Sequence, residues 1–291
     1  MADRPEISLV IPSYRSLRTI GFTIRSLLEQ AGTVSKEILV VDSSGSDITG
    51  WIRTRFPTVR IIHLAERLYP GAARNLGAQE ASGDFLGFLD ADVVAEPNWL
   101  DTLSSRIRKH PDSIAGGFVG NANPHFEASR LQHWIEFSEF VPGTSSGPRD
   151  FLSSSNLFLS RSTFEAVGGF PEEWPMAEDL LLFRRNRGRA WFEGRTGVRH
   201  HHRTRWSGVL RHLNQLGYWS GRLRREEVMQ GSALVRFPLL ALFLPGYRTP
   251  VILSRLWRAD RREGLAATLR TPLLLFALVR WSSGFRRGIQ S

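Results

Sequence analysis

Hydrophobic residues make up 42% and charged residues 23% of the 291-residue sequence, which are values of an ordinary globular protein and do not fit wholesale disorder. The absence of cysteine excludes disulfides, zinc–thiolate sites and thiol nucleophiles. The formal net charge of +10 favours anionic partners, such as nucleic acid, acidic lipid headgroups or a phosphorylated substrate.

The first ninety residues alternate between strand-like and helix-like stretches. A β-branched apolar run at residues 7–11 ends at Pro12, and apolar residues then recur at helical spacing. The strands expected in chain order are 7–11, 37–41, 59–64 and 85–89, and the helices are 19–30, 48–55 and 71–81. This alternation predicts right-handed βαβ units and a parallel sheet, so the expected fold class is α/β.

Polar residues follow three of these strands at the point where each strand ends. They are Pro12-Ser-Tyr14, Asp42 and Asp90-Ala-Asp92. In open α/β sheets, ligands bind beyond the carboxyl ends of the strands. We therefore expect the three clusters to converge on one crevice.

Asp90 and Asp92 are the sharpest chemical feature. Two carboxylates separated by one residue can share a hard divalent cation, and Mg²⁺ and Mn²⁺ both prefer oxygen ligands. The alternative is a pair of solvated aspartates in a turn. Because the preceding stretch, 85–89, is wholly apolar, the pair lies at the mouth of a buried strand, which favours the metal site.

Asp42 and Arg74 each allow two interpretations. Asp42 could accept hydrogen bonds from a nucleobase or ribose, or it could cap the turn that follows its strand. Arg74 lies at the start of the helix 71–81, where a guanidinium could hold diphosphate oxygens in a fork. The alternative for Arg74 is an ordinary surface arginine.

Glu178-Asp179 and His200-His-His202 are weaker signals when taken alone. The two acids open a predicted helix at 180–187, where acidic residues are common because they complement the helix dipole. The alternative is that the two acids take part in catalysis. The histidines could supply a third metal ligand or form a surface run.

Considered in order, these segments resemble the family 2 glycosyltransferases, which have the GT-A fold. The matching pieces are Val10-Ile-Pro-Ser-Tyr14, Ile38-Leu-Val-Val-Asp42-Ser-Ser-Gly-Ser-Asp47, Gly71-Ala-Ala-Arg-Asn-Leu-Gly77, Phe88-Leu-Asp-Ala-Asp92, Ser155-Asn-Leu-Phe158, Val167-Gly-Gly-Phe-Pro-Glu172, and Glu178-Asp179 followed by Arg184-Arg185. The resemblance covers about residues 6 to 205. It implies a Rossmann-like, mostly parallel sheet flanked by helices.

The same resemblance implies a domain organisation. The GT-A catalytic domain spans residues 1–205, with nucleotide-sugar binding over about 6–115 and the acceptor side over about 116–205. Residues 206–291 form a basic, amphipathic and apolar helical region at the C-terminus.

For the nucleotide, the resemblance places Pro12, Tyr14 and Asp42 in the nucleoside pocket and gives Arg74 and Asp90 to the rest of the nucleotide sugar. The sequence has Ser43 where the family commonly has a second aspartate. This departure leaves the base of the donor open between a UDP and a GDP type.

For the chemistry, the resemblance assigns Asp92 to the metal together with Asp90. A late histidine completes the site, His200 or alternatively His202. Asp179 would be the general base, with Glu178 supporting it.

Two features refine the expected reaction. The Gln-x-x-Arg-Trp signature of processive synthases is absent after residues 180–183, which favours addition of a single sugar. A nucleotidyltransferase, which is one alternative, would show a glycine-rich, lysine-containing loop near the first strand, and Pro12-Ser-Tyr-Arg15 supplies none. The other alternative is a non-catalytic homologue that binds nucleotide or glycan.

The C-terminal region is crowded with arginine. Apolar residues recur at helical spacing over 203–225 with arginines around them, which is typical of an interfacial membrane helix. The alternative is a helix packed on the catalytic domain with an arginine-rich solvent face. Prolines and arginines interrupt the apolar stretches 233–253 and 264–284, so these look interfacial or re-entrant rather than spanning.

The expected function is therefore an inverting, metal-dependent transfer of one sugar from a nucleoside-diphosphate sugar to a glycan or lipid-linked acceptor. Such a reaction belongs to polysaccharide or glycolipid biosynthesis. Residues 1–6 are polar and show no secretory signal, so we expect a cytoplasmic protein peripherally associated with the inner face of the cell membrane. No nucleic-acid motif is present, and no nucleic-acid partner is expected.

Overall fold

The computed structural model describes residues 4–32, 34–185, 189–227 and 231–291. The chain divides into two compact units. The first comprises Met1–Val119 and Ser145–His201, and the second comprises Gly120–Thr144 and His202–Ser291. The second unit thus includes a segment predicted to belong to the catalytic region, because a helix in that segment shares a core with the C-terminal helices.

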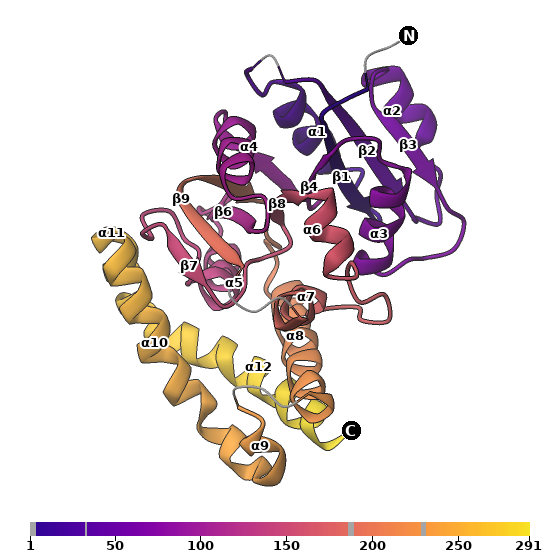
Figure 1. Cartoon of the computed structure of the whole chain (residues 1–291). Helices are drawn as coiled ribbons and strands as arrows, with labels where there is room; N and C mark the ends of the chain where they lie inside the picture. The colour runs from indigo at the N-terminus through magenta and orange to yellow at the C-terminus, as the bar shows by residue number, and fades with distance from the viewer. Residues whose placement is uncertain (1–3, 33, 186–188, 228–230) are drawn as a thin grey trace. The chain divides into compact units, whose positions relative to one another are not determined.

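The N-terminal part of the first unit is a parallel sheet with helical crossovers (Figure 1). Its strands are β1 (Ile7–Ser13), β2 (Lys36–Asp42), β3 (Arg60–His63) and β4 (Phe85–Leu89), and its helices are α1 (Ile20–Leu28), α2 (Thr49–Arg55) and α3 (Pro70–Glu80). β1 pairs in parallel with β2 and β4, and β2 pairs in parallel with β3. The predicted βαβ units are confirmed, with boundaries shifted by one or two residues.

Beyond β4 the sheet continues in antiparallel pairs. Its further strands are β5 (Val93–Ala95), β6 (Ile114–Asn121), β7 (Gly147–Arg149), β8 (Asn156–Ser160) and β9 (Ala190–His200). Among the described residues the order is β3-β2-β1-β4-β8-β6-β9-β5, with β7 on β9. The expected parallel arrangement therefore holds for the first four strands only, and the whole sheet is mixed. Antiparallel neighbours need no crossover helix, and the regular strand–helix alternation of the sequence stops at residue 89.

The strand register brings the predicted polar clusters to one edge. Ser13 pairs with Asp42, and Asp42 pairs with His63, so three parallel strands end level with one another. Val10 pairs with Phe88, which places the end of β4 beside the end of β1. The strand ends that carry the predicted polar clusters therefore lie side by side, as the sequence led us to expect.

Three further helices complete the first unit. They are α4 (Trp99–Lys109), α6 (Arg161–Ala166) and α7 (Glu178–Arg185). The structure confirms that the two acids open α7. The predicted end of this helix at residue 187 lies outside the described residues.

The second unit is helical and has its own apolar core. Its elements are α5 (Glu127–Phe137), α8 (Trp206–Glu226), α9 (Ala233–Arg236), the 3₁₀ helix η1 (Pro238–Phe243), α10 (Leu244–Ala259), α11 (Arg261–Leu269) and α12 (Thr271–Gln290). Trp134 of α5 and Leu213 of α8 are fully buried in this core together with Leu278 of α12. α8 is the helix expected at 203–225, but its apolar stripe packs against protein, which contradicts an interfacial helix laid on a membrane.

α8 and α12 cross at very short distance through two pairs of glycines. A Cβ added at Gly217 would lie 2.0 Å from the carbonyl oxygen of Trp281, and one added at Gly221 would lie 2.2 Å from that of Phe285. Gly284 and Gly288 make the reciprocal approach to α8. Small residues four positions apart let helix backbones approach in this way.

Across the described part of the chain, no single helix is long and apolar enough to cross a membrane. α11 and α12 meet the length and composition only as a pair, and a bend of 78° separates them.

Candidate active site

Asp90, Asp92 and His200 form a cluster of potential metal ligands. Each offers one ligand atom, and these atoms all lie within 4.8 Å of one another. His200 Nε2 is 3.3 Å from Asp92 Oδ1. Two carboxylates and an imidazole suit Mn²⁺ and are compatible with Mg²⁺, so the residues present fit a divalent cation.

The backbone holds this cluster in place. Val93 pairs with His200 in the sheet, and the His201 amide donates to the Asp92 carbonyl at 2.8 Å. The Asp90 amide donates to the Ser155 carbonyl at 3.3 Å. The turn after β4 is therefore tied to β9 on one side and to the chain before β8 on the other.

The two candidate histidines, His200 and His202, lie in different surroundings. β9 ends at His200, so His202 lies outside the strand. His202 belongs to the second unit, where its Nε2 lies 3.1 Å from Nδ1 of His133. Within the described residues, the cluster with Asp90 and Asp92 contains His200 alone among the histidines.

Arg74 is a buried connector between two carboxylates. Its Nη2 donates to Asp90 Oδ1 at 2.5 Å, and its Nη1 donates to Glu178 Oε1 at 2.7 Å. The side chain is 2% exposed, and its guanidinium lies 5.2 Å from the centre of the Phe170 ring. Burial by itself lowers the pKa of Arg74, but the charges of Asp90 and Glu178 more than offset this effect and raise it.

This placement differs from the fork to diphosphate oxygens that the sequence suggests. Both terminal nitrogens of Arg74 are engaged by carboxylates, and the residue is not at the surface. Its geometry is that of a group that fixes the orientation of Asp90 and Glu178.

Glu178 and Asp179 lie at the start of α7 and face the loop before β8. Ser154 Oγ donates to Glu178 at 3.2 Å, and the Ser154 amide donates to Asp179 Oδ2 at 3.3 Å. The Leu180 amide donates to Asp179 Oδ1 at 2.8 Å. Removal from water and the neighbouring charge of Glu178 raise the pKa of Asp179 to about 7, against the opposing effects of these amides and of Arg74.

The backbone before α7 is strained. Ala177 has φ of 70°, in the left-handed region that costs a non-glycine residue about 1–2 kcal/mol. Such residues cluster at functional sites, where the surrounding structure enforces them. Here the strained residue directly precedes the Glu178-Asp179 pair.

The glycine-bracketed motif of α3 is explained by close packing. A Cβ at Gly77 would meet Val10 Cγ1 at 2.3 Å, and a Cβ at Gly71 would meet the Pro171 carbonyl at 2.2 Å. Asn75 exchanges two hydrogen bonds of 2.9 Å with the backbone of Phe170. α3 is thereby locked to the chain that leads into α7, which fixes the position of Arg74.

Asp42 is fully buried, and its carboxylate is surrounded by protein donors. Ser13 Oγ and Ser44 Oγ donate to Oδ1 at 2.7 and 2.8 Å. His63 Nδ1 lies 2.9 Å from Oδ2, and the Ser44 amide donates to the same oxygen at 3.4 Å. The turn-capping interpretation is thus realised, and the carboxylate holds the ends of β1, β2 and β3 together.

Tyr14 lies after β1 at the same edge and is 37% exposed. The guanidinium of Arg67 lies 4.4 Å from the centre of its ring, and that of Arg15 lies 5.2 Å from it. Tyr14 therefore has two guanidinium groups near its ring beside the end of β1, where Pro12 is the last residue but one.

Three residues of this site were not predicted. His63 is the last residue of β3. The expectation that polar residues at strand ends line the site, which selected Asp42, therefore also points to His63. Ser154 directly precedes the Ser155-Asn156 motif, which is a weak signal for a loop at the site. Arg67 lies outside every predicted element, and only the folded structure brings it to Tyr14.

A family model described as glycosyl transferase family 2 matches residues 8–168. Among curated proteins, glycosyltransferase AglE of Haloferax volcanii is 30% identical over 172 residues, which cover 57% of this chain and 56% of AglE. The Escherichia coli protein WfgD, named UDP-Glc:alpha-D-GlcNAc-diphosphoundecaprenol beta-1,3-glucosyltransferase, is 35% identical over 113 residues, or 38% of this chain and 44% of WfgD. The chain spans about half the length of these curated relatives.

Among solved structures, the mannosyltransferase PcManGT of Pyrobaculum calidifontis, in complex with GDP-Man and Mn²⁺, superposes with a TM-score of 0.62. The match covers 99% of this chain and 86% of that protein at 16% sequence identity. It shows that the fold is of the GT-A type, with the mixed sheet and flanking helices described above.

Proposed function

The chain belongs to glycosyl transferase family 2, and on that premise we propose that it transfers a single sugar from a nucleoside-diphosphate sugar to an acceptor hydroxyl, with inversion at the anomeric carbon. The relatives support the donor class. WfgD is named for UDP-Glc, and the PcManGT structure is a complex with GDP-Man, so a UDP or a GDP donor is proposed here.

A divalent cation, Mg²⁺ or Mn²⁺, held by Asp92, Asp90 and His200 would supply positive charge next to the departing diphosphate. The support is the donor set itself, two carboxylates and an imidazole at one strand edge. Arg74 keeps Asp90 oriented toward this group by holding one of its carboxylate oxygens.

Asp179 is proposed as the general base. The acceptor oxygen forms a bond to the anomeric carbon, the bond from that carbon to the diphosphate breaks, and the acceptor proton moves to the Asp179 carboxylate. A pKa raised to about 7 suits this part, because a base works best when its pKa lies near the operating pH. A single displacement of this kind inverts the anomeric centre.

The observation that carries the proposal is the Asp90–Arg74–Glu178 bridge. It joins the aspartates after β4 to the acidic pair that opens α7, so the proposed metal ligands and the proposed base are fixed to each other through one buried guanidinium. Catalysis by positioning and charge stabilisation needs a fixed relation of this kind. Pro12 and Tyr14 would form the nucleoside side of the same edge, and the buried Asp42 would support it by holding the strand ends together.

The acceptor is proposed to be a glycan or a lipid-linked glycan, in polysaccharide or glycolipid biosynthesis. WfgD is named for a diphosphoundecaprenol-linked acceptor, which supports the lipid-linked case. Such an acceptor implies a protein at the cytoplasmic face of the cell membrane, associated with it peripherally.

A donor screen by thermal shift tests the proposal. With Mn²⁺ present, the correct UDP- or GDP-sugar at about a hundred times its Kd should stabilise the chain by about 2.7 kcal/mol. The wild type should also hydrolyse that donor slowly, and Asp179→Asn should bind it without turnover. If no nucleoside-diphosphate sugar shifts the melting temperature, the proposal is wrong. If the wild type and Asp179→Asn bind alike and neither turns over, the chain is a binding protein rather than an enzyme.

A further inference from the structure

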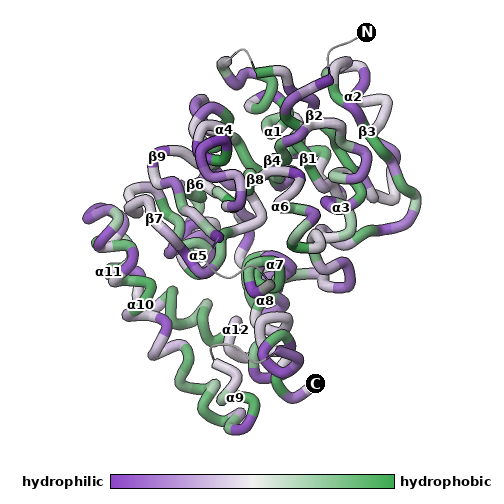
Figure 2. The backbone as a smooth tube through the Cα atoms, viewed as in Figure 1, coloured by the Kyte–Doolittle hydropathy of each residue, from purple (hydrophilic) through white to green (hydrophobic). Residues whose placement is uncertain are grey.

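η1 and its flanking residues expose an unusual amount of apolar side chain. Phe243 is 72% exposed, Leu239 is 70% exposed and Tyr247 is 65% exposed. The set, which we call the η1 face, consists of Phe237, Leu239, Leu240, Leu242, Phe243 and Tyr247. Figure 2 shows the chain around α9 and much of α10 and α12 as hydrophobic. Apolar surface gathered in this way marks an interaction site rather than a random scatter.

The segments that form the η1 face and α12 carry charges of one sign. Residues 228–259 and 264–291 contain no aspartate or glutamate, whereas arginines occur throughout both stretches. Arg236 lies 5.7 Å from the centre of the Phe237 ring, so a cation stands directly against the face. Apolar and aromatic side chains on segments whose charged residues are all arginine are complementary to a surface of anionic lipid.

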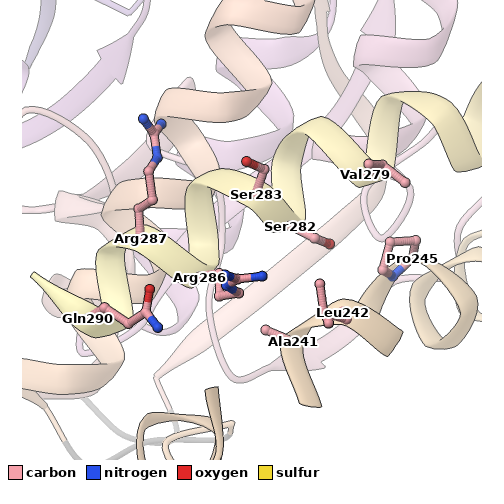
Figure 3. A pocket seen from close by; sticks show the side chains of 9 residues that line it. All are labelled: Ala241, Leu242, Pro245, Val279, Ser282, Ser283, Arg286, Arg287 and Gln290. Carbon is pink, nitrogen blue, oxygen red and sulfur yellow. The ribbon is translucent and has the colours of Figure 1, made fainter. Parts of the chain in front are cut away.

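A pocket of about 310 Å³ opens between η1 and α12 beside this face (Figure 3). Its wall combines apolar residues with Ser282, Arg286 and Gln290. In Figure 3, Arg286 and Ser282 lie on the side of α12 toward Leu242, whereas Arg287 extends away from it. Within the described ranges, Ser282 Oγ is buried without a hydrogen-bond partner and Arg286 has no ion-pair partner. An unmatched hydroxyl and a guanidinium are the groups that a lipid phosphate would engage.

We propose that the η1 face docks on an anionic bilayer, with Leu239 and Phe243 in the interfacial zone and a lipid phosphate in the pocket at Arg286. A second copy of the chain fits less well, because two such faces would bring together arginine-bearing segments that have no carboxylate of their own. The inference rests on the proposed function only in that a lipid-linked acceptor gives the docking its purpose. The membrane-facing element in this proposal is η1 rather than α8, because the apolar side of α8 is covered by protein.

Co-sedimentation of the full chain with vesicles tests this docking. The wild type should bind vesicles of phosphatidylcholine with phosphatidylglycerol, bind pure phosphatidylcholine much less, and dissociate at high salt. Leu239→Glu with Phe243→Glu should weaken binding at least about tenfold, because two exposed apolar side chains that would enter the bilayer are lost. Arg286→Gln should weaken binding to the anionic vesicles about fivefold, as expected for one cation near the surface.

Matched controls separate a local effect from a change in net charge. Leu17→Glu with Leu28→Glu adds the same charge at exposed leucines of the first unit, and Arg53→Gln removes one exposed arginine there. Both controls should bind like the wild type. Equal binding by the η1 double variant, or equal binding to neutral vesicles, would overturn the proposal. The proposal would also be overturned if the wild type did not bind vesicles but was a dimer, and the η1 double variant was a monomer.

The same proteins, measured with donor and Mn²⁺, keep the two proposals apart. The η1 double variant should retain the donor-dependent thermal shift of the wild type, because the η1 face lies in the second unit and the proposed donor site lies in the first. A wild type that binds anionic vesicles but shows no donor shift contradicts sugar transfer and supports docking. A donor shift without vesicle binding supports sugar transfer and contradicts docking.

Discussion

Arg74 donates a hydrogen bond of 2.7 Å to Glu178, a residue 104 positions further along the chain. The same guanidinium holds Asp90 from the other side. A buried cation with two carboxylates is compensated only while both contacts remain. The site therefore depends on Arg74 for stability as well as for geometry.

We predict that Arg74→Ala destabilises the protein by about 3–5 kcal/mol, because it leaves Glu178 buried without its counter-ion. Urea unfolding measures the change. The control is Arg4→Ala, which breaks the 2.8 Å ion pair between Arg4 and Asp84. Because these side chains are 63% and 67% exposed, the change should cost about 1 kcal/mol or less. Similar losses in both variants would show that the Arg74 bridge is not a buried structural element.

Asp179→Asn should abolish transfer while leaving the fold and donor binding intact. An amide keeps the shape of the side chain but cannot take the proton, and a general base contributes about 10²- to 10⁴-fold to the rate. The measurement is kcat with the donor identified by thermal shift, together with the donor Kd. Retention of more than about a tenth of the wild-type rate would remove Asp179 from the base role.

The raised pKa of Asp179 also predicts a pH dependence of activity and of stability. As a base, Asp179 must be ionised, so kcat/KM should fall as the pH drops below about 7. For stability the sign is opposite: a carboxyl whose folded pKa exceeds its ordinary value of 3.8 contributes stability below that value and loses it as the pH rises through about 7. The asparagine of Asp179→Asn cannot ionise. The Tm of this variant minus that of the wild type should therefore be larger above pH 7 than near pH 4. A pH-independent Tm difference would contradict the raised pKa.

The sequence was sufficient for the parts of the site that depend on strand ends. Alternating apolar runs locate β1, β2 and β4, and parallel strands end at one edge, so Asp42 and Asp90 could be placed together without coordinates. His200 follows from the same logic once it is recognised as the end of a strand. Local pattern and the geometry of parallel sheets contain this information.

Contacts between distant segments could not be predicted in the same way. The helical pattern of α3 shows where Arg74 begins a helix, but it contains nothing about Glu178, and the expected fork to diphosphate became a bridge between carboxylates. Amphipathicity likewise identifies an apolar face without naming what covers it. Leu213 of α8 proved to be buried by protein, whereas Leu239 of η1 remains exposed.

The metal cluster predicts a distinction between two neighbouring histidines. Asp92→Ala should abolish the Mn²⁺-dependent part of the donor thermal shift, and His200→Ala should reduce it, because both residues offer potential ligand atoms in one cluster. His202→Ala is the control and should retain the Mn²⁺-dependent part, even though loss of its contact with His133 lowers the baseline Tm. If His202→Ala removes the metal effect and His200→Ala does not, the third ligand is His202.

The crossing of α8 and α12 gives a prediction about the second unit alone. A Cβ at Gly284 would lie 1.9 Å from the Asn214 carbonyl oxygen, a distance at which one helix must move. Gly284→Ala should therefore destabilise the protein by about 1–3 kcal/mol, the range for overpacked interiors.

Gly208→Ala in α8 is the matched control for this crossing, because the nearest atom to an added Cβ there is Arg203 Cδ at 3.7 Å. That variant should gain about 0.5–1 kcal/mol, since alanine favours a helix over glycine. Thermal unfolding of the two variants side by side should thus give shifts of opposite sign. Two shifts of the same sign would mean that helix propensity, rather than the backbone contact between α8 and α12, decides the effect of an added methyl group.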